Sequence, residues 1–508
     1  MKWSRRPWFW LALSALLLAV QIGPWYYEFG DADRYLSVAR NLAQAHRLTC
    51  LGSPCLKYPP GYAAIVSPLF LIRERPFLEL SILNWLLSVA FMMGVYVWAR
   101  RVAPQAAVWI AALSVANNIF WIYHRRPASE LAFVTVLVWT VNSLAWVMSA
   151  RRGRSLAAGG AAALLLLALL CLIRPVGIAA AGGCGAAMLA AARRGMVSWR
   201  RTVAMSLLAA AVAVPAVAVV MLRERATAHA TGEHTYLDVL AATQSGRLLR
   251  GPWLTISEIG RVTIPGMLKS YNRHRQWLDV NMFVYVPFFA LLAAGWLRWV
   301  RRQADPFAWT LPCYATILTI CAWDAGGRYW IPMIPALVTC AWFAAERLQD
   351  RRLPLLRAAW AAHVAAAAIY WLAIDLPATR QLNRQWPTVD AMAAQIPADS
   401  GPIAASESLK DLRIMLALTL DRRVARNADD AEVQRRAEWI VTAADAPPPA
   451  GFAEVSRSGG YCLFHRQAVA DTRAGKAVLL DVDGTSPPPA GAQATVVLPA
   501  ETGKQHSS

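Results

Sequence analysis

The chain has 508 residues, of which 57% are hydrophobic and only 16% are charged, yet 51 Lys and Arg against 31 Asp and Glu leave a net charge of +20. A soluble enzyme carries about 25% charged residues and few long apolar runs, so the composition excludes that class and favours a polytopic membrane protein. The excess charge alone would suggest a nucleic-acid partner. However, residues 1–375 hold 37 basic and 16 acidic residues, whereas residues 376–508 hold 14 and 15, so the excess lies in the apolar part and nucleic acid is excluded.

Eleven apolar stretches approach the roughly 20 residues that cross a hydrocarbon core of about 30 Å. They lie at residues 7–25, 78–99, 105–123, 130–150, 155–173, 176–192, 203–222, 281–299, 306–323, 329–345 and 354–374. Alternate short segments between them are basic and together carry 19 cations. The pattern predicts a polytopic α-helical membrane protein with about eleven transmembrane helices. Because cytoplasmic loops are enriched in Lys and Arg, it also predicts a cytoplasmic N-terminus, an uncleaved first span and an exterior C-terminus.

The first exterior loop, residues 26–77, opens with Asp31, Asp33 and Tyr35 and continues with apolar positions at helical spacing. The spacing predicts an amphipathic helix at the membrane surface with a carboxylate at its start. A helix N-terminus stabilises a carboxylate as the anion. Taken alone, Asp31 is most simply interpreted as a capping residue.

The same loop ends with Lys57 and Tyr58, followed by a Pro59-Pro60-Gly61 turn that re-enters the membrane. This arrangement predicts that a cation and a carboxylate lie at the level of the lipid headgroups. The alternative interpretation is an aromatic belt with a proline turn. Cys50 and Cys55 in this loop predict a disulfide if the compartment is oxidising, and a zinc pair is the less favoured alternative.

Further ionisable residues stand at the exterior ends of later spans. They are Glu130, which opens the fourth span, and the cations Arg126, Arg174 and Arg328. Helix capping explains Glu130 equally well, and snorkelling competes as an explanation for the arginines. Ionisable groups at membrane depth usually face a cavity or a bound ion, and the arginine fork suits phosphate. Together with Lys57, the set predicts a site for a lipid-linked phosphate beside a general base.

The last quarter of the chain predicts a small exterior α/β domain. Helical periodicity at 389–396 and 409–420 is followed by a strand-like run at 438–441 and a hairpin around 458–460. The predicted division is a transmembrane domain at 1–375, an exterior α/β domain at 376–469 and a disordered tail at 470–508.

These residues, in this order, resemble the GT-C superfamily of integral membrane glycosyltransferases, especially the bacterial branch related to protein O-mannosyltransferases and the lipid A aminoarabinose transferase. The resemblance covers roughly residues 1–350, and no single motif in it is specific. The matching motifs are Asp31 to Tyr35, Ala39 to Leu42, Pro59 to Tyr62, Ser129-Glu130, Arg174 to Gly177, and Arg328 to Pro335.

The resemblance implies transfer of a sugar from a polyprenyl-phosphate donor to an acceptor hydroxyl on the exterior face of the membrane. The first-loop general base of the family falls on Asp31, although Asp33 leaves that assignment open. The second-loop acidic residue falls on Glu130, and the late basic residue that contacts the donor phosphate falls on Arg328. The remaining predicted substrate-binding residues are Tyr35, Lys57, Tyr58, Arg126, Arg174 and Tyr329.

Direct displacement with one base predicts inversion at the anomeric carbon. No cofactor is required, and a divalent metal bridging Asp31 or Asp33 to the phosphate is compatible with the residues. The predicted partners are the lipid-linked donor, a glycan, lipid or protein acceptor, and membrane lipids, with the chain in a bacterial inner membrane of the cell envelope. The alternatives are a flippase or other transporter of lipid-linked saccharides and a scaffold acting through the periplasmic domain. Transporters tend to show matching halves with charges at mid-depth, which this sequence lacks.

Overall fold

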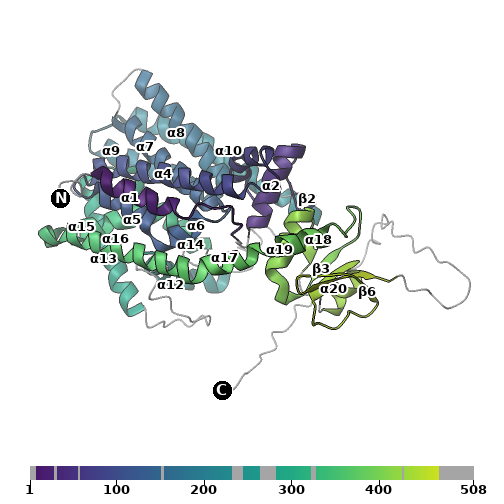
Figure 1. The fold of residues 1–508 in the computed structure, drawn as a ribbon. Helices are drawn as coiled ribbons and strands as arrows, with labels where there is room; N and C mark the ends of the chain where they lie inside the picture. The colour runs from purple at the N-terminus through teal and green to yellow at the C-terminus, as the bar shows by residue number, and fades with distance from the viewer. Residues whose placement is uncertain are drawn as a thin grey trace, which may run out of the picture. The chain divides into compact units, whose positions relative to one another are not determined.

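Apolar segments of near-bilayer length fold as helices, because a helix satisfies its own backbone hydrogen bonds without water. The computed structural model describes residues 7–27, 31–54, 58–149, 154–231, 244–263, 282–321, 328–425, 428 and 430–467. The helices up to residue 149 are α1 (Pro7–Ala19), α2 (Ala32–Ala45), α3 (Pro60–Val66), η2 (Ser67–Leu71), α4 (Phe77–Val102), α5 (Ala107–Ala116), α6 (Asn118–His124) and α7 (Ser129–Ser149) (Figure 1).

The later apolar part continues with further helices and short helical turns. They are α8 (Arg154–Ile173), η3 (Pro175–Gly177), α9 (Ile178–Arg193), α10 (Trp199–Thr231), α12 (Gln244–Thr263), α13 (Met282–Arg302), α14 (Pro306–Cys321), η5 (Arg328–Met333), α15 (Ile334–Ala344), η6 (Ala345–Arg351), α16 (Arg352–Tyr370) and the π-helical turn η7 (Trp371–Asp375).

Each of the eleven predicted apolar stretches contains a helix in the structure. Among the described residues, seven helical segments are long and apolar enough to cross a membrane. The number is eight if α5 and α6, which bend by 59° on either side of Asn117, form one broken span. The Asn117 side chain makes this break tolerable, because it accepts hydrogen bonds from the backbone N–H groups of Ile119 and Phe120 at the start of α6. The chain is therefore a multi-pass membrane protein, as its composition predicts.

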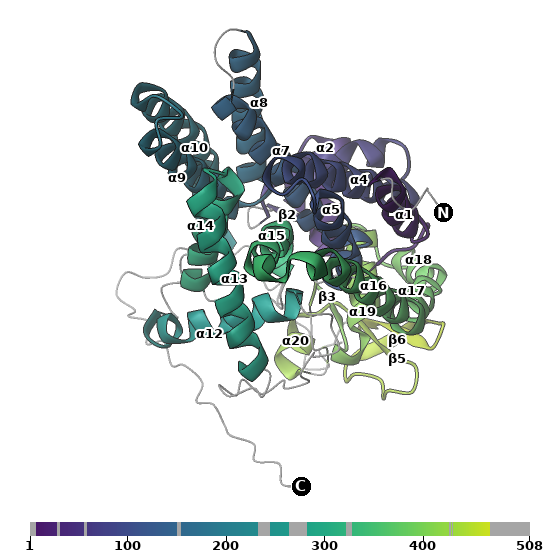
Figure 2. The same cartoon turned by 90° about the vertical axis from the view of Figure 1, so that its left-hand side faces the viewer.

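Close helix contacts hold the bundle together. Helix α7 packs against α4 and α8, and α9 packs against α14 and α10 (Figure 2). Small residues allow these approaches. A Cβ at Gly183 would clash with Thr310 of α14, and one at Gly295 of α13 would clash with the carbonyl of Cys340 in α15.

The loop at residues 26–77 forms the predicted amphipathic helix, α2, whose apolar face is buried. A two-stranded hairpin of β1 (Thr49–Cys50) and β2 (Ser53–Pro54) follows α2, and α3 then begins with the proline turn. Cys50 is disulfide-bonded. Because Cys55 and Lys57 lie outside the described residues, the predicted Cys50–Cys55 pairing and the position of Lys57 stay predictions.

The C-terminal part forms the predicted small α/β fold. Its five-stranded sheet has the order β4-β3-β5-β7-β6. Strand β3 pairs in parallel with β4 and with β5, and β7 pairs antiparallel with β5 and with β6. The strands are β3 (Ile403–Ala405), β4 (Val424–Ala425), β5 (Trp439–Ala443), β6 (Phe452–Ser458) and β7 (Tyr461–Arg466). The helical elements are α17 (Leu376–Asn383), α18 (Trp386–Ala393), η8 (Glu407–Leu409), α19 (Lys410–Leu420) and α20 (Ala431–Arg436).

The junction between the two parts is helical. Helix α16 passes through η7 directly into α17, so the predicted boundary after Asp375 falls within a helical run. Residues up to Arg466 belong to one compact unit by their contacts. The division at residues 375 and 469 therefore stays a prediction, and the tail at 470–508 lies outside the described residues.

Candidate functional site

Two carboxylates at the starts of different helices face the same arginine. Asp31 directly precedes α2, but its side chain makes no capping hydrogen bond to that helix. Its Oδ2 instead lies 3.6 Å from Nη1 of Arg328, at the start of η5. The Nε of the same guanidinium lies 3.9 Å from Oε1 of Glu130, in the first turn of α7. Residues that are far apart in sequence thus meet at one arginine.

A second arginine completes the group. Nη2 of Arg174 donates to Oε1 of Glu130 at 2.8 Å, and its Nε donates to Oγ of Ser129 at 3.1 Å. Arg174 stands between α8 and η3, where Pro175 prevents the helix from continuing unbroken. Asp31, Glu130, Arg174 and Arg328 are called here the carboxylate–arginine cluster.

The burial of the cluster is graded. The side chain of Glu130 is 1% exposed and that of Arg174 is 11% exposed. The side chain of Arg328 is 21% exposed and that of Asp31 is 32% exposed. Glu130 is therefore the enclosed carboxylate and Asp31 the one that a substrate can reach.

Two buried atoms of the cluster have unused hydrogen-bonding capacity. Within the described part of the chain, neither Oε2 of Glu130 nor Nη1 of Arg174 has a hydrogen-bond partner, and both atoms are shielded from solvent. Burying an unsatisfied polar atom is costly, and such atoms usually serve a ligand or ordered water. An acceptor atom and a cationic donor atom on the two members of one ion pair suit a ligand that carries both hydroxyl and anionic groups.

Tyr58 fixes the orientation of Asp31. Its hydroxyl donates to Oδ1 of Asp31 at 2.8 Å and accepts from Nη1 of Arg34 at 2.9 Å. Burial, and next the negative charge of Asp31, raise the pKa of Tyr58. The phenol therefore remains protonated and keeps donating to the carboxylate.

The other two predicted tyrosines, Tyr35 and Tyr329, lie near Arg174 and Arg328. The hydroxyl of Tyr35 lies 3.1 Å from Oγ of Ser129, and burial raises the pKa of this phenol. The ring of Tyr329 lies under both guanidiniums, 4.9 Å from that of Arg174 and 5.1 Å from that of Arg328. Cation–π contacts of this kind hold a guanidinium in place without neutralising it.

Asp33 has different surroundings from Asp31. Its side chain is buried in α2 and accepts the backbone N–H of Arg34 at 2.9 Å. Burial raises the pKa of Asp33, opposed by that backbone hydrogen bond and by the charges of Arg34 and Arg413. Of the two candidate bases, Asp31 is thus the one that contacts both Tyr58 and Arg328.

Arg126 is engaged elsewhere. Its Nη2 lies 3.8 Å from Oδ1 of Asp375, and Nη1 of Arg125 lies 2.9 Å from Oδ2 of the same residue. An internal carboxylate, Asp375, therefore supplies at least part of the negative charge that faces Arg125 and Arg126. Asp375 directly follows the last predicted span, a position that could have marked it as a partner for exterior cations.

Sequence reasoning also missed Arg34 and Glu258. Oε2 of Glu258, a buried residue of α12, accepts from the indole of Trp330, two residues after Arg328. The hydrophobic spacing of α12 gives no sign of this contact, because the acidic residue and its partner come from distant segments.

In the cluster, both carboxylates are paired with arginine. The described residues contain no group of three or more His, Cys, Asp or Glu that could hold a metal. Asp31 and Glu130 each face arginine instead, and a guanidinium supplies the positive charge that a metal would bring. The predicted possibility of a divalent metal bridging Asp31 or Asp33 to the phosphate stays a prediction.

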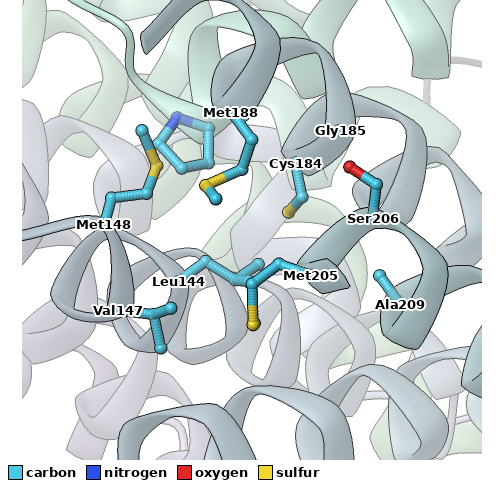
Figure 3. A pocket seen from close by; sticks show the side chains of 10 residues that line it. Leu144, Val147, Met148, Cys184, Gly185, Met188, Met205, Ser206 and Ala209 are labelled. Carbon is cyan, nitrogen blue, oxygen red and sulfur yellow. The ribbon is translucent and has the colours of Figure 1, made fainter. Parts of the chain in front are cut away.

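A small apolar pocket lies apart from the cluster. It is enclosed by α7, α9, α10 and the start of α14, with Met148, Met188 and Met205 in its wall (Figure 3). No residue of the carboxylate–arginine cluster lines it. We assign it no part in the chemistry.

Comparison with known proteins shows the fold. No protein-family model matches the chain, and no curated protein matches its sequence. ArnT from Cupriavidus metallidurans bound to undecaprenyl phosphate is 12% identical, with a TM-score of 0.53 over 91% of this chain and 98% of that one. ArnT in the apo state is 14% identical, with a TM-score of 0.55 over 90% and 96%.

A second protein of similar structure is archaeal. The oligosaccharyltransferase AglB from Archaeoglobus fulgidus, in complex with an inhibitory peptide and a dolichol-phosphate, is 14% identical, with a TM-score of 0.53 over 86% of this chain and 69% of that one. Another structure of the Archaeoglobus enzyme is a complex with Zn and sulfate. These likenesses show the fold alone: this chain has the polytopic architecture of ArnT and AglB.

Proposed function

We propose that the chain is a glycosyltransferase that moves a sugar from a polyprenyl-phosphate donor to an acceptor hydroxyl on the exterior face of the membrane. One observation carries the proposal: a partly exposed carboxylate, Asp31, shares an arginine with a buried carboxylate, Glu130, beside a second arginine. This set contains a base and the cations for a phosphate leaving group. The fold is that of proteins solved with undecaprenyl phosphate and with dolichol-phosphate.

Asp31 is the proposed general base. The acceptor oxygen attacks the anomeric carbon, its proton passes to a carboxylate oxygen of Asp31, and the bond from the anomeric carbon to the phosphate oxygen breaks. The donor hydrogen bond from Tyr58 keeps the carboxylate oriented. A single displacement with one base gives inversion at the anomeric carbon.

The arginines are proposed to stabilise the leaving group. Negative charge builds on the phosphate as the glycosidic bond breaks, and preorganised cations in a site of low polarity stabilise such charge strongly. Nη1 of Arg174 is buried with no partner among the described residues, so it is available to a phosphate oxygen. Arg328 lies between the proposed base and Glu130, with guanidinium nitrogens 3.6 Å from Asp31 and 3.9 Å from Glu130.

Glu130 is proposed to act mainly on the arginines and the sugar. Its Oε1 binds Arg174, while its Oε2 has no partner among the described residues. A hydroxyl of the donor sugar that donates to Oε2 would satisfy this atom. Glu130 would then help to select a hydroxylated donor.

We also propose a bacterial inner-membrane location with a cytoplasmic N-terminus and an exterior C-terminus. The basic segments between alternate spans support this orientation. On the exterior side, residues 376–469 would form the periplasmic domain. Labelling of single introduced cysteines from each side of sealed vesicles tests the orientation.

The test of function is transfer from a panel of synthetic polyprenyl-phosphate sugars by the purified protein in lipid nanodiscs. We expect one donor to be consumed, with release of polyprenyl phosphate and formation of a glycoside of opposite anomeric configuration. Retention of configuration would contradict the single-displacement mechanism. Movement of an intact donor between leaflets without bond cleavage would favour the transporter alternative.

A further inference from the structure

A carboxylate of the C-terminal fold is bound by several groups of the first exterior loop. Asp421 directly follows α19, and its Oδ1 accepts from Oγ of Ser37 and, at 3.2 Å, from the backbone N–H of Leu51. Its Oδ2 accepts from Nδ2 of Asn41 at 2.7 Å. Nη2 of Arg40 lies 3.2 Å from Oδ1. Donors from both α2 and the β1–β2 hairpin thus converge on one side chain.

The backbone of Asp421 adopts a conformation that non-glycine residues seldom adopt. Its φ of +52° lies in the left-handed region, which a residue after a helix most often fills with glycine. Keeping an aspartate there costs conformational energy, although Asp tolerates this region better than most residues. The donors of the loop give a reason for the carboxylate at this position.

The ionised form of Asp421 is the one that matches its partners. An ionised carboxylate only accepts hydrogen bonds, and every polar group that contacts it here is a donor. An amide in its place would present N–H groups to one of these donors. Hydrogen bonds to a charged acceptor are also stronger than neutral ones.

The helix held in this way carries the proposed base. Asp31 directly precedes α2, while Ser37, Arg40 and Asn41 lie within the same helix. At the start of α2, the positive charge of Arg413 in α19 acts on Asp33. Helix α19 and the residue after it therefore interact with α2 at two places: at Asp33, near the proposed base, and at Ser37 and Asn41, further along the helix.

We propose that Asp421 is a positioning residue, by which the C-terminal domain holds α2 so that Asp31 stays within reach of Tyr58 and Arg328. The inference rests on the proposed function, because it treats Asp31 as the base. Arg174 and Arg328 belong to other segments and make no contact with Asp421 in the described structure, so we expect the contact to affect binding of the donor phosphate less than the placement of Asp31.

A second ion pair provides a matched control. Arg75, which precedes α4, pairs with Asp390 of α18, so this pair also joins the apolar part to the C-terminal fold. It involves no residue of α2, and the two side chains are 31% and 47% exposed. Asp390→Asn therefore removes a comparable carboxylate without touching the proposed contact.

The variants are D421G, D421N and D390N in the full-length protein in nanodiscs. Glycine removes the carboxylate while favouring the left-handed backbone, so D421G separates the contact from strain. We measure amide hydrogen exchange of residues 32–45, together with kcat and the donor KM for transfer.

For D421G we expect exchange in α2 to rise by about tenfold or more, as loss of hydrogen bonds to a charged group implies. The kcat falls by roughly 10-fold to 100-fold, because small displacements of a catalytic group are costly, while the donor KM stays within about twofold. D421N falls between wild type and D421G, and D390N matches wild type in both measurements.

Three results would overturn the inference: unchanged exchange in α2, a faster exchange in α2 with unchanged kcat, or an equal rise of exchange over the whole protein. The last would show a role in folding only. If the wild-type protein transfers no sugar from any donor, the proposed function fails and the catalytic part of the inference with it. The exchange data would still decide whether Asp421 holds α2.

Discussion

The two halves of the carboxylate–arginine cluster differ in what surrounds them. Glu130 is enclosed, with Arg174 at 2.8 Å and a side chain that is 1% exposed. Asp31 is about one-third exposed and is bound by a neutral phenol at 2.8 Å and by Arg328 at 3.6 Å. The surroundings of Glu130 neutralise its charge with an arginine, whereas those of Asp31 leave the carboxylate partly open to solvent. The comparison teaches that two acidic residues of one site can have different surroundings, which supports the different tasks proposed for them: holding cations for Glu130 and accepting a proton for Asp31.

The largest expected effect separates the two halves by activity. Asp31→Asn keeps the shape and the acceptor for Tyr58 but removes the base, so kcat should fall by about 10²-fold to 10⁴-fold. Thermal stability should change little, because the residue is partly exposed. Steady-state transfer assays with the accepted donor check this.

Asp33→Asn is the control for that variant, since it changes a neighbouring carboxylate that lies outside the contacts of Tyr58 and Arg328. If Asp33→Asn abolishes transfer and Asp31→Asn does not, the assignment of the base must be exchanged.

The next effect separates the halves by stability. Glu130→Ala leaves the buried guanidinium of Arg174 without its carboxylate, and breaking a buried ion pair in this way costs about 3–5 kcal/mol. The variant should unfold at a clearly lower temperature in nanodiscs or detergent. Glu130→Gln, which still accepts from Arg174, should lose less, and equal stability of Glu130→Ala and wild type would show that the pair does not hold the fold.

The smallest effect is a pH dependence at Asp33. Burial raises the pKa of this carboxyl in the folded protein, so its contribution to stability is fully present below the unfolded pKa of about 3.9 and is lost as pH rises through the folded value. Asp33→Asn should therefore be more stable than wild type at neutral pH and lose this part of the pH dependence. Unfolding curves measured from pH 4 to pH 8 test the sign, and a destabilised variant at neutral pH would contradict it.

The sequence predicts the helices of the apolar part well, because length and hydropathy determine a membrane helix almost by themselves. Asp31, Tyr58, Glu130, Arg174 and Arg328 are also predictable as a group, since all stand at the exterior ends of segments. Their meeting follows from topology. The roles proposed for them remain proposals.

Other features depend on tertiary pairing and leave little trace in the sequence. β3 and β4 are three and two residues long, too short for any alternation to mark them as strands. Asp421 gives no local signal, because its partners lie about 370 to 384 residues away along the chain. The partner of Arg126 was missed for the same reason.

The uninterrupted passage from α16 through η7 into α17 has a mechanical consequence. A flexible linker would let an exterior domain rotate freely, whereas a continuous helix transmits its inclination to the domain at its end. Membrane helices adjust their tilt when the thickness of the bilayer changes. Under the proposed function, such a change of tilt would be passed on to the sheet, and through the contacts of Asp421 to the helix that follows Asp31, so the catalytic rate would depend on the length of the surrounding lipid chains.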